Sequence, residues 1–157
     1  CPSSASAMSD ASIHDIGEVP PNGAQHGNAI LYINGAKGTI SGNLVSRYQK
    51  NGITVSGKNA AGDGPSPFPT SATVKNNVVA GRGAVDYIAQ NGIVIRSGAS
   101  ATVKGNSISH VWYAGTENAT ATGLLLYGAD RVSASNNTMV DVQVEIYKDF
   151  NKGSVRP

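Results

Sequence analysis

Short runs in which apolar and polar residues alternate recur along the whole chain. Ile93-Val94-Ile95, Thr102-Val103-Lys104 and Ser107-Ile108-Ser109 illustrate one such stretch. Alternation with a period of two predicts short strands that bury one face. No stretch of useful length carries the period of an amphipathic helix. The pattern therefore predicts an all-β fold.

These strands belong to an internal repeat. An apolar residue, two further positions, Asn, one position and a second apolar residue occur around Asn43, Asn77, Asn106 and Asn137, and a degenerate first copy has Ala11 in place of Asn. The five anchors are separated by 32, 34, 29 and 31 residues. A unit of this size with three short strands cannot bury its apolar face alone, so successive units must stack. We predict a parallel β-helix of five coils.

Equivalent residues of stacked coils form columns along the axis of such a solenoid. The repeat predicts four inward columns: Ile13, Val45, Val79, Ile108 and Met139; Met8, Ile40, Val74, Val103 and Ala134; Ile30, Ile53, Ile93, Leu124 and Val144; and Tyr32, Val55, Ile95, Leu126 and Ile146. Asn tolerates a left-handed backbone, and its amide can bond the Asn of the next coil. We therefore expect a ladder of Asn43, Asn77, Asn106 and Asn137 in the bend between two strands.

The length suits a single domain that covers residues 1–157. Two stretches without periodicity, near residues 58–70 and 113–122, are expected to be loops inserted into the regular coil. Because the chain starts with Cys1 and not with Met, we expect it to be a segment of a longer protein. A single Cys cannot form an internal disulfide, and the role of Cys1 stays open.

Composition narrows the classes of partner. Charged residues make up 14% of the chain and the net charge is +2. No basic run or basic face with interleaved aromatic residues occurs, so we expect no nucleic-acid partner. No segment approaches the length of about 18 apolar residues that a transmembrane helix needs, so we expect none.

The strings "NGIVI", "ATVKGN", "ATGLLLYGAD" and "VSASNN" resemble the repeats of right-handed parallel β-helix proteins of the pectate-lyase-like superfamily. The resemblance runs from about Ala7 to Tyr147. It implies a right-handed coil and a secreted or cell-surface protein, bacterial in origin. It also implies a connection with polysaccharide, through lyase, hydrolase, epimerase or binding activity. The matching residues are structural, so they do not select among these activities.

A polar column follows the Asn anchors by four residues, at Asp15, Arg47, Gly81, His110 and Asp141. Its register predicts that Asp15 lies beside Arg47 and His110 beside Asp141. In a lyase, His110 or Lys50 would be the base, Asp141 would orient His110, Arg47 would neutralise a uronate carboxylate, and Tyr87 or Tyr113 would be the acid. The alternative is a set of solvated turn residues that pair weakly.

Flat and cationic side chains gather between the Asn bend and the next strand. Tyr48, Tyr87, Trp112 and Tyr113 could stack on sugars, and Arg82 could bind a carboxylate beside them. The alternative is that these aromatic residues fill space between the loops and the core. The seven Asp residues are scattered singly, so we expect no metal site and no cofactor, and we consider Ca²⁺ only for the case that the protein is a lyase.

The leading functional hypothesis is an extracellular scaffold, non-catalytic or degenerate, whose turn and loop face binds polysaccharide, cell-surface glycan or another macromolecule. A polysaccharide lyase or epimerase that acts on uronate polymers is the first alternative. The second is a structural spacer or assembly module, because the open ends of a solenoid expose strand edges that can associate end to end.

Overall fold

The structure, a computed structural model, describes residues 5–149, so Cys1 lies outside the described part. Three parallel sheets of five strands account for all of its strands. Sheet A contains β1 (Ala5–Ser9), β4 (Lys37–Ser41), β7 (Ser71–Lys75), β10 (Ser100–Lys104) and β13 (Val132–Ser135). Sheet B contains β2 (Ser12–His14), β5 (Leu44–Ser46), β8 (Val78–Val85), β11 (Ser107–Tyr113) and β14 (Thr138–Val142). Sheet C contains β3 (Asn28–Tyr32), β6 (Asn51–Ser56), β9 (Asn91–Arg96), β12 (Thr122–Tyr127) and β15 (Val144–Asp149).

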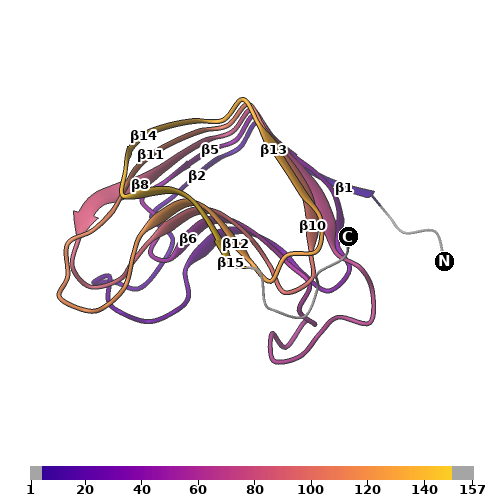
Figure 1. The fold of residues 1–157 in the computed structure, drawn as a ribbon, viewed down its shortest axis with the longest axis horizontal. Helices are drawn as coiled ribbons and strands as arrows, with labels where there is room; N and C mark the ends of the chain where they lie inside the picture. Colours follow the sequence, from indigo (N-terminus) through magenta and orange to yellow (C-terminus); the bar gives the residue numbers. More distant parts are fainter. Residues whose placement is uncertain (1–4, 150–157) are drawn as a thin grey trace.

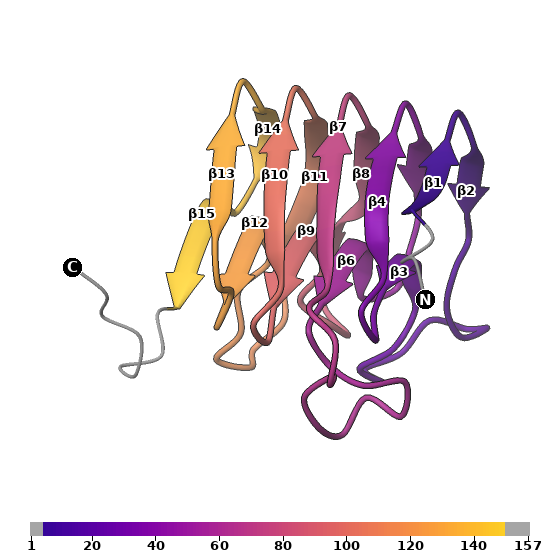
Figure 2. The same cartoon turned by 90° about the vertical axis from the view of Figure 1, so that its right-hand side faces the viewer.

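The chain passes through sheets A, B and C in turn and then repeats the circuit. Figure 1 looks along the resulting coil, and Figure 2 shows the strands of sheet A side by side in chain order. Residues 57–70 form a long loop between β6 and β7, and residues 114–121 form a loop between β11 and β12. The structure is therefore the predicted all-β, parallel β-helix.

The strand register confirms two predicted core columns in all five coils. These are the column of Ile13, Val45, Val79, Ile108 and Met139 and the column of Met8, Ile40, Val74, Val103 and Ala134. The two columns of sheet C are confirmed from β3 to β12.

The predicted columns are wrong in β15, where the register is displaced by two residues. Leu124 pairs with Ile146 and not with Val144, and Leu126 pairs with Lys148. A displacement of two residues keeps the same face of the strand toward the core, so alternation alone cannot detect it. The last coil therefore places a lysine, not an isoleucine, at the end of the Tyr32 column.

The predicted Asn ladder forms. Asn43 donates its backbone N–H and its Nδ2 to Oδ1 of Asn77, at 3.0 and 2.9 Å. Asn77 does the same to Asn106 and Asn106 to Asn137. Each Nδ2 also donates to a carbonyl of the preceding coil, such as Ile40 O for Asn77 at 3.0 Å. The ladder thus satisfies buried backbone and side-chain groups in every bend that it crosses.

The left-handed residue of each bend is the one before the ladder Asn, which corrects the expected reason for Asn. Asp10, Gly42, Asn76, Gly105 and Asn136 have φ between 52° and 68°. The ladder Asn residues have no positive φ. Asn occupies the ladder because its amide both donates and accepts, and not because of its backbone conformation.

Two Asn-Gly pairs, Asn51-Gly52 and Asn91-Gly92, begin strands of sheet C. A Cβ at Gly52 would lie 2.5 Å from Cγ1 of Val79, and one at Gly92 would lie 2.6 Å from Cγ2 of Ile108. Both glycines therefore bring the backbone close to the core of sheet B, where a side chain would not fit. Asn-Gly here begins a buried parallel strand and does not form a hairpin turn.

Replacing Asn77 by Ala is expected to lower the free energy of unfolding by about 2–4 kcal/mol, because it leaves buried donors of Asn43 and the carbonyl of Ile40 without partners. Urea denaturation followed by circular dichroism measures the change. The matched control is Asn76→Gly, at an exposed residue with φ of 54° that suits glycine, and it should not be destabilised. Equal losses in the two variants would contradict the ladder's role.

Tyr48→Phe is expected to raise the free energy of unfolding by about 1 kcal/mol. Tyr48 is completely buried, and its hydroxyl has no hydrogen-bond partner among the described residues. Removing that hydroxyl therefore removes a desolvated group without breaking a bond. Tyr127→Phe, at an exposed tyrosine, should change stability by less than about 0.5 kcal/mol. A destabilised Tyr48→Phe variant would show that the hydroxyl is bonded.

Candidate functional site

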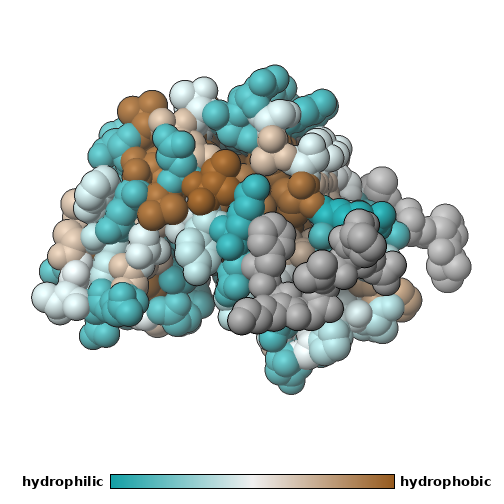
Figure 3. Space-filling view, in the orientation of Figure 1, coloured by the Kyte–Doolittle hydropathy of each residue, from teal (hydrophilic) through white to brown (hydrophobic). Residues whose placement is uncertain are grey.

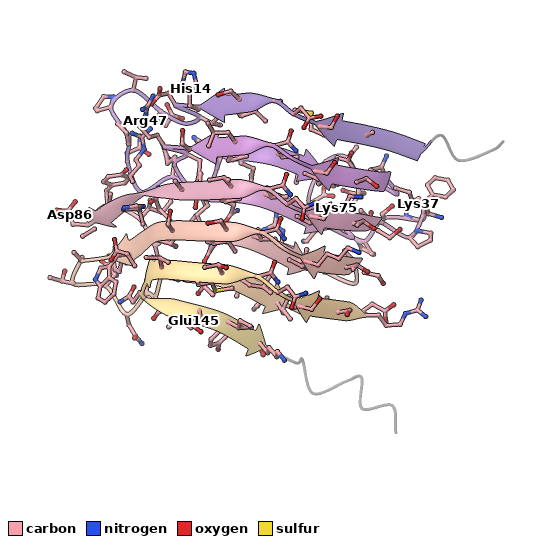
Figure 4. All side chains as sticks on the ribbon, turned by 90° about the horizontal axis from the view of Figure 1, so that it is seen from above. His14, Lys37, Arg47, Lys75, Asp86 and Glu145 are labelled. Carbon is pink, nitrogen blue, oxygen red and sulfur yellow. The ribbon has the colours of Figure 1, made fainter. Side chains whose placement is uncertain are left out.

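Four polar residues meet where sheet B ends in the first coils. Arg47 donates from Nε and Nη2 to the carboxylate of Asp15 at 2.8 and 2.6 Å, and His14 Nδ1 lies 2.9 Å from Asp15 Oδ2. Arg82 Nη2 lies 3.8 Å from the same carboxylate. Figure 4 shows His14 and Arg47 together, on the side opposite Lys37 and Lys75. The predicted Arg47–Asp15 pair forms, and the hydrogen bond from Arg47 holds the pKa of Asp15 well below its usual range.

The other predicted pair, His110 and Asp141, does not form. The two residues occupy equivalent positions in β11 and β14, each with a left-handed φ. Within residues 5–149 they share no hydrogen bond or salt bridge, and His110 Nδ1 lies 3.0 Å from its neighbour Ser109 Oγ. The structure therefore does not bring Asp141 to orient His110.

The predicted aromatic residues differ in their exposure. Tyr48 and Tyr113 belong to the buried core, so neither presents a face to a ligand. Tyr87 is half-buried, and its hydroxyl has no hydrogen-bond partner in the described chain. Trp112 is 40% exposed and is the one predicted aromatic residue with a ring at the surface. For Tyr48 and Tyr113 the packing alternative is the correct one.

Lys50 directly precedes β6, and Arg96 is the last residue of β9. Nζ of Lys50 donates to the carbonyl of Ala89 at 2.8 Å. Burial, and then the charge of Arg96, lower the pKa of Lys50, and burial lowers the pKa of Arg96. Neither cation has a carboxylate partner within residues 5–149, and Nε of Arg96 is buried without a hydrogen bond. The fold thus holds two half-buried cations on sheet C that interact electrostatically and form no salt bridge within residues 5–149.

Arg96 belongs to the outward face of sheet C, which we term the sheet C face. Ile93 and Ile95 point into the core, so Val94 and Arg96 point outward. Register defines two outward rows along the axis: Leu31, Thr54, Val94, Leu125 and Tyr147, and Ser56, Arg96, Tyr127 and Asp149. Thr54 and Ser56 are completely buried, whereas Tyr127 is 52% exposed. Along this face, the polar side chains of Thr54 and Ser56 are therefore buried, whereas the tyrosine rings of the later coils are exposed.

A second Asn ladder runs along the edge of this face. Asn51 Nδ2 donates to Asn28 Oδ1 at 2.6 Å, and Asn91 Nδ2 donates to Asn51 Oδ1 at 2.9 Å. Thr54 Oγ1 also donates to Asn28 Oδ1, at 2.9 Å. Sequence reasoning missed this ladder and Arg96. The available signal was the common position of Asn28, Asn51 and Asn91 two residues before each inward Ile.

The C-terminal end of the coil exposes part of the core. Ile146 is 45% exposed, whereas its register partner Leu124 is completely buried. Figure 3 shows apolar side chains across the middle of this end. No described coil covers it, which is the geometry that an assembly module would use.

Residues 5–149 contain no group of three or more His, Cys, Asp and Glu side chains placed to hold a metal ion. The same residues contain no helix long and apolar enough to cross a membrane.

The Asp15 carboxylate is expected to stay ionised to lower pH than an ordinary Asp, whose pKa is about 3.9. Because the folded pKa is lowered, its stabilising effect is complete above that value and is lost only as the pH falls through the lowered pKa. Carboxyl ¹³C chemical shifts followed against pH measure this. Arg47→Gln should return the titration toward the ordinary range. An unchanged titration in that variant would mean that Arg47 is not the cause.

Comparison with known proteins agrees with this geometry. No curated protein and no solved structure gives a significant match to the chain. A family model described as "right handed beta helix region" matches residues 3–151, nearly the whole sequence. The three stacked parallel sheets agree with that description, and the pectate-lyase-like resemblance is consistent with it. The chain belongs to the right-handed β-helix family.

Proposed function

We propose that the protein is an extracellular bacterial scaffold that binds an acidic carbohydrate along the sheet C face without turning it over. The observation that carries this proposal is the pair of half-buried cations, Lys50 and Arg96, without a carboxylate partner in residues 5–149. Partial burial of two like charges that repel each other destabilises the fold unless an anion joins them. A uronate carboxylate would supply that anion.

The geometry of Arg96 suits a carboxylate. Arginine presents a planar fork of donors that binds a carboxylate through two hydrogen bonds. Nε of Arg96 is buried and has no partner in the described chain. A carboxylate would therefore meet the terminal amino groups of the fork. Lys50, whose Nζ already donates to Ala89 O, keeps further protons for a second oxygen.

The residues along the axis extend the site beyond one sugar. Tyr127 occupies the position of Arg96 in the next coil, about 4.8 Å away. Its exposed ring offers a flat apolar surface to a pyranose face. Asp149 ends this row two coils from Arg96, so the cationic part of the face is confined to β6 and β9. We expect the acidic sugar over these two strands and the following sugar on Tyr127.

This location revises the expected binding face. The turn after sheet B offers one exposed aromatic ring, Trp112, because Tyr48 and Tyr113 are core residues. Arg47 is engaged by Asp15 through two hydrogen bonds, and Arg82 lies near the same carboxylate. The sheet C face, in contrast, combines cations without counter-ions and accessible rings.

Arg96→Gln is expected to weaken binding of an oligogalacturonate roughly 10- to 100-fold, because a hydrogen bond to a charged group contributes about 1.5–3 kcal/mol. Isothermal titration calorimetry measures the affinity. Arg131→Gln is the matched control, at an exposed arginine paired with Asp130 on another part of the surface. The proposal is wrong if Arg96→Gln binds as tightly as the wild type, or if a neutral oligosaccharide binds as well.

A lyase is the second candidate, and the lowered pKa of Lys50 favours it. A lysine with a lowered pKa is a better candidate for the base that takes the proton beside a uronate carboxylate, and Arg96 would neutralise that carboxylate. β-Elimination leaves an unsaturated sugar that absorbs ultraviolet light. The same oligogalacturonate incubated with the protein should then gain absorbance that Lys50→Gln abolishes. If the absorbance does not rise with the wild-type protein, the lyase hypothesis is wrong and only the binding hypothesis is left.

A further inference from the structure

The outward positions of sheet A, which we term the sheet A face, carry cations and no carboxylate. Met8, Ile40, Val74 and Val103 pack in or against the core, so the residues that alternate with them point outward. From β1 to β13 the outward positions are Ala5, Ala7 and Ser9; Lys37, Thr39 and Ser41; Ser71, Thr73 and Lys75; Ser100, Thr102 and Lys104; and Ser133 and Ser135. The three lysines of this set form no salt bridge within residues 5–149. The face is therefore cationic in the coils of β4, β7 and β10.

The opposite charge gathers where sheet B ends and the chain turns toward sheet C. Asp86, Glu117 and Asp141 are exposed there, one in each of the last three coils. None of them belongs to a salt bridge in the described chain. From residue 105 to residue 130 the sequence has no Lys or Arg. Arg82, in the coil of Asp86, lies 3.8 Å from Asp15 of the first coil.

Hydrogen bonds between the acidic turns join them into one surface. Ala114 donates its N–H to the carbonyl of Val85 at 2.8 Å, and Oε1 of Gln143 accepts from the N–H of Ala121 at 3.0 Å. Trp112 lies in this stack with 40% of its surface exposed, and it is the single Trp of the chain. We term residues 84–87, 112–118 and 141–143 the turn side. It combines carboxylates with an accessible aromatic ring.

The sheet A face and the turn side lie on opposite sides of the coil and share one axial repeat. Figure 4 shows Asp86 on the side opposite Lys37 and Lys75. Lys75 and Asp86 belong to the coil of β7–β9, and Lys104 and Glu117 belong to the coil of β10–β12. Neighbouring coils are about 4.8 Å apart on both sides. Two copies side by side, with parallel axes, therefore bring the cations of one opposite the carboxylates of the other, coil by coil.

We propose that the sheet A face of one molecule binds the turn side of a second copy. Lys75 then pairs with Asp86 of that copy and Lys104 with its Glu117. The Trp112 ring packs on the lysine stems, where it gains a cation–π attraction. Because the two surfaces differ, the contact is heterologous and does not close, so it adds further copies in a row.

Charge complementarity favours a second copy as the occupant, because one chain supplies both surfaces with the same repeat. Lys75 and Lys104 lie directly opposite each other on adjacent strands, and like charges in that arrangement destabilise a sheet. The carboxylates of a second copy remove this repulsion. Exposed ion pairs are individually weak and are screened by salt, so the association is weak and depends on ionic strength. The sheet C face lies outside the contact, and this inference does not rest on the proposed function.

Sedimentation velocity at several protein concentrations tests the proposal. The sedimentation coefficient should rise with concentration at low ionic strength and stay that of the monomer in about 1 M salt, where the Debye length is about 3 Å. Lys75→Glu/Lys104→Glu should weaken association at least about tenfold, because it turns attraction into repulsion. It keeps a like-charged pair at the same positions, so the fold should be as stable as in the wild type. Lys58→Glu/Lys148→Glu, with the same change in net charge outside both surfaces, is the matched control and should associate normally.

Reversal of the other surface completes the test. Asp86→Lys/Glu117→Lys alone should also stay monomeric, whereas an equimolar mixture of the two reversed variants should associate. Fluorescence of Trp112 should shift to shorter wavelength as the wild type associates. The proposal is overturned if the wild type stays monomeric at low ionic strength, or if the mixture does not associate. Normal association of Lys75→Glu/Lys104→Glu would overturn it too, because it would place the contact elsewhere, for example at the ends of the coil.

Discussion

The spacing of neighbouring coils is set by the backbone hydrogen bonds of three parallel sheets, about 4.8 Å from strand to strand. Every other feature of the molecule depends on this repeat. Residues about 30 positions apart become direct neighbours, so one residue type at one place in the repeat becomes a row. The core columns and the two Asn ladders both result from this constraint.

The same constraint separates scaffold from surface. Inward positions must fill a closed space, so they are apolar in all but the last coil, where Lys148 takes the place of an apolar residue at the open end. Outward side chains contact solvent or the inserted loops, so their residue types are less restricted. The three sheets differ in these outward residues. Sheet A presents hydroxyls and ammonium groups, whereas sheet C presents rings beside two half-buried cations. We attribute function to these outward differences.

The fold could be predicted from the sequence because equivalent residues of the repeat occur at nearly constant separations along the chain. The Asn43 ladder and the column of Ile108 follow from fixed offsets, and both are present. The error in β15 arose because Val144 and Ile146 have the same parity, so either continues the alternation. Offsets also cannot show which residue of a bend carries the left-handed φ. The repeat identifies Asn77 as the ladder residue but does not show that the left-handed residue is Asn76.

The site was less accessible to sequence reasoning because it depends on irregular segments. Tyr48 follows a bend and looks exposed in a linear reading, but its ring packs in the core beside Gly52 of β6. Arg96 stands at the end of an apolar alternation, and nothing local indicates that its charge acts on Lys50, 46 positions earlier. The register of β6 and β9 opposes Arg96 to Ser56, so register alone does not predict this interaction either.

The Asn ladder also gives the solenoid a direction. Each side-chain oxygen accepts from the coil before it, as Asn77 accepts from Asn43, and each coil in turn leaves its own N–H groups for the coil after it. During synthesis the N-terminal coil emerges from the ribosome first. Every newly made coil then brings the acceptor that the previous bend lacks, and a coil that arrives without Asn leaves buried donors behind it. The ladder thus couples the order of translation to the order in which the bends become complete.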